Sequence, residues 1–86
     1  MTGVVKAWRN TFGFIIPDTW LQGDVYVHHL DLDESCAEPA RKGYPPFRKL
    51  YQGEGVEFEI KPDARRPGQF EAINVHLIQP APERRM

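Results

Sequence analysis

The stretch Thr11-Phe12-Gly13-Phe14-Ile15-Ile16 has the pattern of a β-strand with two aromatic residues on one face. Successive side chains of a β-strand point to opposite faces, so Phe12 and Phe14 share one face, and Gly13 and Ile15 share the other. Gly13 leaves a gap between the two aromatic residues that an ordinary side chain would fill. If the face of the two rings is exposed, it forms a flat apolar surface of the kind that usually marks a binding site.

Four other segments have the alternation or the composition of short strands. We predict them at residues 3–8, 24–28, 56–60 and 70–77, with the strand of the opening stretch at 12–16. The inward positions are expected to be Ile15, Val25, Val27, Val56, Phe58, Ile60, Ile73, Val75 and Leu77. Five short strands in 86 residues predict one small all-β domain that closes into a barrel, because closure removes exposed strand edges.

The predicted strands leave a long connector at residues 33–49, and loops of this length are usually functional or mobile. They also leave a tail at residues 79–86, and we expect this tail to be flexible. The net charge of −1 does not by itself indicate a nucleic-acid partner. The basic residues are nevertheless clustered and can form a basic face on a nearly neutral protein. These clusters lie at residues 6–9, 41–42, 48–49 and 61–66.

Several other classes of function find little support in the residues. No apolar run reaches membrane-spanning length and no signal peptide is evident, so we expect a cytoplasmic protein, with the nucleus or an organelle as the alternatives, and no membrane partner. The single cysteine, Cys36, lies in an acidic stretch that would raise its pKa, which disfavours a nucleophile. His28 and His29 are expected to point to opposite faces of a strand and to hold no metal. We therefore expect no catalytic residues, no metal site and no cofactor.

Two motifs resemble those of the cold-shock domain family. The segment Asn10-Thr11-Phe12-Gly13-Phe14-Ile15 is similar to the family form Lys-Gly-Phe-Gly-Phe-Ile, and Asp24-Val25-Tyr26-Val27-His28 is similar to Asp-Val-Phe-Val-His. The resemblance covers residues 2–78 and implies a cold-shock domain at 1–78. The implied fold is a five-stranded antiparallel barrel of the OB type with a long loop between strands 3 and 4.

The chain departs from the family pattern in its first strand. Lys6-Ala7-Trp8-Arg9 stands where the family usually has Lys-Trp-Phe-Asn, so one aromatic residue is missing. Period-two alternation favours Trp8 on the face of Lys6, beside the rings; the alternative is that Trp8 closes the end of the barrel. Thr11 replaces the family glycine before the first phenylalanine, and His29 stands where many members have Phe or Gln.

The rings and the neighbouring basic residues favour binding of single-stranded nucleic acid, because unpaired nucleobases stack on aromatic side chains with little regard for sequence. The resemblance adds His29 and the loop residues Phe47 and Arg48. The predicted nucleic-acid-binding residues are Lys6, Trp8, Arg9, Phe12, Phe14, Tyr26, His28, His29, Phe47 and Arg48. The expected ligand is RNA, with DNA possible, and the expected role is that of an RNA chaperone or translation regulator.

A second hypothesis is a protein-interaction or assembly subunit on the same scaffold, with reduced nucleic-acid binding. The near-zero net charge and the missing ring at Ala7 favour it. The connector at 33–49 contains Tyr44 and Pro45-Pro46 and could meet a protein partner. Trp20 lies in another loop and could do the same. Fold alone does not decide between the two hypotheses.

Overall fold

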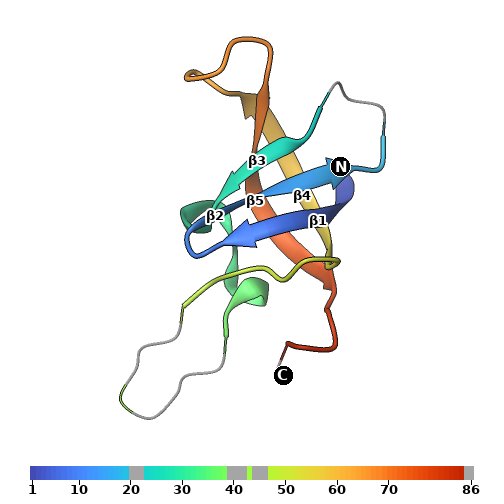
Figure 1. The fold of residues 1–86 in the computed structure, drawn as a ribbon, viewed down its shortest axis with the longest axis vertical. Coiled ribbons are helices and arrows are strands. Elements are labelled where there is room, and N and C mark those ends of the chain that lie inside the picture. The colour runs from blue at the N-terminus through green and yellow to red at the C-terminus, as the bar shows by residue number, and fades with distance from the viewer. Residues whose placement is uncertain (20–22, 39–42, 44–46, 85–86) are drawn as a thin grey trace.

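The computed structural model describes residues 1–19, 23–38, 43 and 47–84 of the chain. Within them, five strands form a barrel (Figure 1), and its interior is filled by buried apolar side chains. The elements are β1 (Thr2–Arg9), β2 (Phe12–Pro17), β3 (Val25–His28), the single-turn 3-10 helices η1 (His29–Asp31) and η2 (Glu34–Cys36), β4 (Gly55–Pro62) and β5 (Phe70–Gln79). All five predicted strands are present. No helix in the described ranges is long and apolar enough to span a membrane.

The strands form a closed barrel in the order β1-β2-β3-β5-β4, as expected for an OB-type fold. Four neighbouring pairs are antiparallel, but β3 and β5 are parallel, with Tyr26 opposite Glu71. The prediction of a purely antiparallel barrel is wrong at this pair. The reason is topological: a ring of five strands cannot alternate in direction all the way round, so at least one pair must be parallel.

The barrel interior is filled by side chains from all five strands and from the connector. Most predicted inward residues are buried, and Ile60 is half-buried against the core. The buried apolar residues are Val5, Ile15, Val25, Val27, Leu32, Cys36, Leu50, Val56, Phe58, Ala72, Val75 and Leu77. In β5 the buried position is Ala72 rather than Ile73, because Asn74, with φ of 51°, interrupts the alternation next to an irregularity in the β4–β5 pairing.

A bulge in β1 changes the orientation of the residues that follow it. Val5 lies opposite Ile15, but the next paired residue is Ala7, opposite Phe14, so Lys6 is the extra residue. Paired residues of an antiparallel ladder share a face. Ala7 therefore lies on the face of Phe14, and Trp8 lies on the opposite face, across from Gly13.

The two ends of the connector are paired with each other. Ala37 and Arg48 form an isolated antiparallel bridge, and the Lys49 amide donates to the carbonyl of Cys36 at 3.1 Å. The Glu38 amide donates to the carbonyl of Phe47 at 2.8 Å. The connector residues 39–42 and 44–46, including Tyr44 and Pro45-Pro46, lie outside the described residues, as does Trp20. The expectation of a protein partner for this loop stays a prediction.

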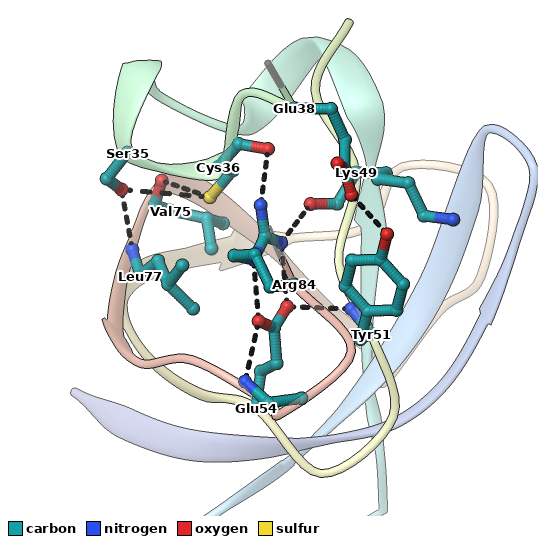
Figure 2. A network of polar contacts seen from close by, with 10 residues as sticks. Ser35, Cys36, Glu38, Lys49, Tyr51, Glu54, Val75, Leu77 and Arg84 are labelled. Atoms are coloured by element: carbon teal, nitrogen blue, oxygen red, sulfur yellow. Dashed lines mark hydrogen bonds and ion pairs between the residues drawn. The ribbon is translucent and has the colours of Figure 1, made fainter. Parts of the chain in front are cut away.

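A buried ion pair joins the C-terminal segment to the start of β4 (Figure 2). Arg84 donates from Nε to Oε2 of Glu54 and from Nη2 to Oε1, each at 2.7 Å. The same guanidinium donates to the carbonyl oxygens of Cys36 at 3.1 Å and Lys49 at 2.6 Å. Arg84 is 5% exposed and Glu54 is fully buried. We call these contacts the Arg84 clamp, because they fasten three separate segments together.

The carboxylate of Glu54 is fully engaged within this site. Besides Arg84, it accepts from the backbone N–H groups of Tyr51 at 2.7 Å and Ala81 at 3.0 Å. Burial opposes its ionisation, but these hydrogen bonds and the Arg84 charge outweigh burial, so the pKa of Glu54 lies below its ordinary value. Glu54 is therefore ionised at neutral pH and neutralises the guanidinium.

Residues 79–84 belong to the tail that we expect to be flexible, and Arg84 of this segment lies against the barrel. Gln79 is the last residue of β5, and Arg84 is buried against the barrel. The segment is rich in proline and charge, which is typical of a mobile end, but its arginine has partners that are distant in sequence. The barrel and the segment after it are thus packed as one unit.

We expect Arg84→Met to destabilise the domain by about 3–5 kcal/mol, because it leaves the Glu54 carboxylate buried and unpaired. Urea unfolding followed by circular dichroism measures the loss. The double variant Glu54→Gln, Arg84→Met removes both buried charges and should recover part of it. Arg65→Met, at an exposed arginine, serves as control. Equal unfolding midpoints for Arg84→Met and the unaltered protein would contradict a structural role for the clamp.

Candidate nucleic-acid interface

Three aromatic rings and one imidazole lie together on the outer side of β2 and β3. Phe12 is opposite His28, and Phe14 is opposite Tyr26. The ring centroids of Phe12 and Tyr26 are 5.9 Å apart at 27°, and those of Phe14 and Tyr26 are 6.0 Å apart at 70°. All four side chains are half-buried. We call Phe12, Phe14, Tyr26 and His28 the ring surface.

The rings lie outside because the interior positions of the same strands are already occupied. Gly13 and Ile15 of β2, and Val25 and Val27 of β3, are all buried. Each of them alternates with a residue of the ring surface. The core therefore does not need the rings, and their outer faces are left for a ligand.

Gly13 is the position at which Trp8 packs into the end of the barrel. Trp8 is half-buried and contacts the core cluster. A Cβ atom at Gly13 would lie 2.7 Å from Cε3 of Trp8 and would also collide with the carbonyl oxygen of Ala7. The expectation that Trp8 stands beside Lys6 on the ring side is wrong, because the bulge at Lys6 reverses the alternation. The packing agrees with the alternative, in which Trp8 closes the barrel end.

The outer face of β1 next to the rings carries Ala7 and Arg9 instead of Trp8. Ala7 lies opposite Phe14, and the exposed Arg9 lies opposite Phe12. Lys6 donates from Nζ to Oδ2 of Asp24 at 2.7 Å, in an ion pair exposed to solvent. Exposed pairs of this kind contribute little, so the Lys6 ammonium can exchange Asp24 for a phosphate at small cost.

His28 and His29 do not point to opposite faces. Strand β3 ends at His28, and His29 begins η1, so the two ring centroids are 4.5 Å apart. Nδ1 of His28 accepts from the backbone N–H of Leu30 at 3.3 Å, which leaves Nε2 to carry the proton of the neutral ring. The imidazole of His28 is thereby oriented at the edge of the ring surface.

The loop between β4 and β5 adds a residue that sequence analysis did not single out. The guanidinium carbon of Arg66 lies 5.1 Å from the ring centroid of Tyr26, a cation–π contact. Asp63, which is buried, shapes this loop by accepting the Arg65 amide at 2.9 Å. A hollow of about 470 Å³ separates the loop from the end of β3. Residues 61–66 form a basic cluster in the sequence. Only the folded arrangement shows that Arg66 is the arginine of this cluster that contacts Tyr26.

The two predicted connector residues are placed differently from each other. Phe47 is 56% exposed, and among the described residues its ring makes no contact with the ring surface. Arg48 donates from Nη1 to the carbonyl of Leu32 at 2.9 Å and so helps to hold the connector. Contact of either residue with nucleic acid stays a prediction.

Within the described ranges, no group of three or more His, Cys, Asp or Glu side chains could hold a metal ion. The thiol of Cys36 is buried, and burial raises its pKa, so it is protonated at neutral pH. Its Sγ lies 3.7 Å from the carbonyl oxygen of Val75, in the core. The side chains of the ring surface and its neighbours offer stacking, hydrogen bonding and positive charge.

Comparison with known protein families matches residues 1–78 to the "cold-shock" DNA-binding domain. The chain belongs to the cold-shock domain family. This confirms the resemblance carried by the two motifs on β2 and β3. This family consists of non-enzymatic domains that bind single-stranded nucleic acid. A comparison with curated proteins found no match.

We expect Gly13→Ala to destabilise the cold-shock domain by about 1–3 kcal/mol, because the added methyl group must displace both the indole of Trp8 and the backbone of Ala7. Urea unfolding gives the loss, and the near-ultraviolet circular dichroism signal should report displacement of the indole. Ile16→Ala, at an exposed position of the same strand, should change stability by no more than about 0.5 kcal/mol. An unchanged unfolding midpoint for Gly13→Ala would show that Trp8 does not fill this space.

Proposed function

We propose that this domain binds single-stranded RNA with little sequence preference and acts as an RNA chaperone or as a regulator of translation. The observation that carries the proposal is the ring surface: three aromatic rings and one imidazole on adjacent strands, outside a core that is complete without them. Single-stranded DNA is a second ligand of the same surface, since stacking does not require a 2′-hydroxyl.

Stacking supports selection of unpaired strands over duplexes. In a duplex the base faces are covered by their neighbours, whereas in a single strand they can turn onto an aromatic ring. Each stacked base contributes about 1–3 kcal/mol, and every base has a π-face, so the gain depends little on sequence. A protein that binds only the unpaired state shifts the pairing equilibrium of RNA towards open strands.

Positive charge around the ring surface supplies the contacts to the backbone. Arg9 lies beside Phe12 on β1, and Arg66 covers Tyr26 from the β4–β5 loop. The Arg66 guanidinium is planar, so a base can stack on it or replace it on the ring. Lys6 becomes available when its exposed pair with Asp24 opens. A net charge of −1 is therefore compatible with binding, because these basic side chains lie around the ring surface.

We expect Phe14→Ala and Tyr26→Ala each to weaken binding of a pyrimidine-rich single-stranded RNA by about 1–3 kcal/mol, through the loss of a stacking surface. Fluorescence anisotropy at fixed salt measures the affinity, and circular dichroism verifies folding. Ile78→Ala is the matched control, since Ile78 is 51% exposed and lies on β5, away from the rings.

Two results would contradict the proposal. Both ring variants could bind as tightly as the unaltered protein, or the unaltered protein could prefer the duplex to its single strand. Absence of binding to any single strand would instead favour the protein-interaction hypothesis for this scaffold.

A further inference from the structure

A second hollow lies beside the ring surface, between the end of β1 and the segment that precedes β4. Its volume is about 300 Å³, and Leu50 contributes to its floor. The other lining residues are Ala7, Trp8 and Arg9 from β1, and Lys49, Tyr51 and Gln52 from the opposite segment. Ala7 and Arg9 lie opposite Phe14 and Phe12, so the hollow opens next to two of the rings.

The charge of this hollow distinguishes it from the one near Arg66. The described residues that line it include Arg9 and Lys49 but no carboxylate. The hollow near Arg66, in contrast, combines arginines with Asp31, Asp63 and Glu71. Two acids contact Tyr51 from outside the lining: Glu54, whose charge is neutralised by Arg84, and Glu38, which accepts from the hydroxyl of Tyr51. A hollow whose described lining carries two cationic side chains and no carboxylate is suited to an anion.

The Arg84 clamp fixes Lys49 and Tyr51 in this arrangement (Figure 2). The carbonyl of Lys49 accepts from Arg84 at 2.6 Å, and its amide donates to Cys36. The Lys49 ammonium lies 4.4 Å from the ring centroid of Tyr51, and the Arg84 guanidinium lies 5.2 Å from the same centroid. The backbone N–H of Tyr51 donates to Glu54. Both residues are thus held in place by contacts with the clamp and with Cys36.

We propose that this hollow is a phosphate-binding subsite for the nucleic-acid strand where it leaves the ring surface. Arg9 and Lys49 hold one phosphodiester between them, and the Arg84 clamp positions Lys49. Ala7 permits this path, because an aromatic side chain at its place would stand between the rings and the hollow. The inference rests on the proposed function, since the phosphate belongs to the strand whose bases stack on Phe12 and Phe14.

The decisive measurement is the salt dependence of RNA binding for Lys49→Gln. For single strands, log K falls with log salt by about 0.7 per neutralised phosphate. Lys49→Gln should make this slope shallower by about 0.7, and Arg9→Gln should have the same effect. The probe is oligouridine, long enough to run past the rings within the range of about 4–16 nucleotides bound per OB fold. Lys61→Gln is the charge-matched control, because Lys61 lies outside this hollow and already pairs with Glu71 at 3.0 Å.

Oligonucleotide length provides a second readout. On the shortest oligouridine that still binds, Lys49→Gln and the unaltered protein should have the same affinity, because the strand ends before the hollow. On longer strands the affinities should diverge. The subsite is overturned if Lys49→Gln keeps the full salt slope on long strands, or if Lys61→Gln reduces the slope equally. Failure of the proposed function would look different, since Phe14→Ala would then leave binding unchanged on strands of every length.

The positioning role of Arg84 is tested with Glu54→Gln, Arg84→Met, after urea unfolding has shown that this variant is folded. The variant should lose the same part of the salt slope as Lys49→Gln, and adding Lys49→Gln to it should cause no further loss. A merely structural role would lower stability while leaving the salt slope intact, and that result would overturn the positioning role.

Discussion

The contact between Trp8 and Gly13 is the constraint on which the binding face depends. Lys6 is an extra residue in β1, so the indole of Trp8 turns into the barrel end, and only a residue without a side chain can lie opposite it. The same reversal brings Ala7 and Arg9 to the outer side, next to Phe14 and Phe12. One bulge therefore turns Trp8 into the core, places the small side chain of Ala7 beside Phe14, and places the cation of Arg9 beside Phe12.

The outer face combines two kinds of surface that suit the two parts of a nucleotide. The ring surface offers π-faces to bases, and the hollow beside it offers two cations to a phosphate. The Arg84 clamp lies below the second part and ties the connector to the start of β4 through buried hydrogen bonds. A buried ion pair is a weak source of stability but can fix a single geometry, which is the property that a phosphate site needs.

The features that could be predicted from the sequence depend on short, unbroken periodicity. Phe12 and Phe14 alternate with Gly13 and Ile15. Because the residues at the inward positions suffice to fill the core, the sequence predicts that the two rings lie on the outer face. The reversal at Trp8 could not be predicted this way, because a period-two pattern assumes that every residue pairs, and the bulge breaks that assumption. The parallel contact of β3 and β5 follows from ring closure and is invisible in any single strand. The partners of Arg84 and Arg66 are distant in sequence, and no local pattern distinguishes these arginines from their neighbours.

The most direct test of this account is a chemical-shift titration of the domain with single-stranded RNA and DNA of matched sequence. Stacking on the ring surface predicts the largest shifts at Phe12, Phe14, Tyr26 and His28, with smaller shifts at Arg9 and residues 49–52 on longer strands. The ranking of the two ligands would show directly whether the 2′-hydroxyl contributes. Shifts confined to the far side of the barrel, around Glu57 and Ile78, would contradict the account, as would their absence at saturating RNA.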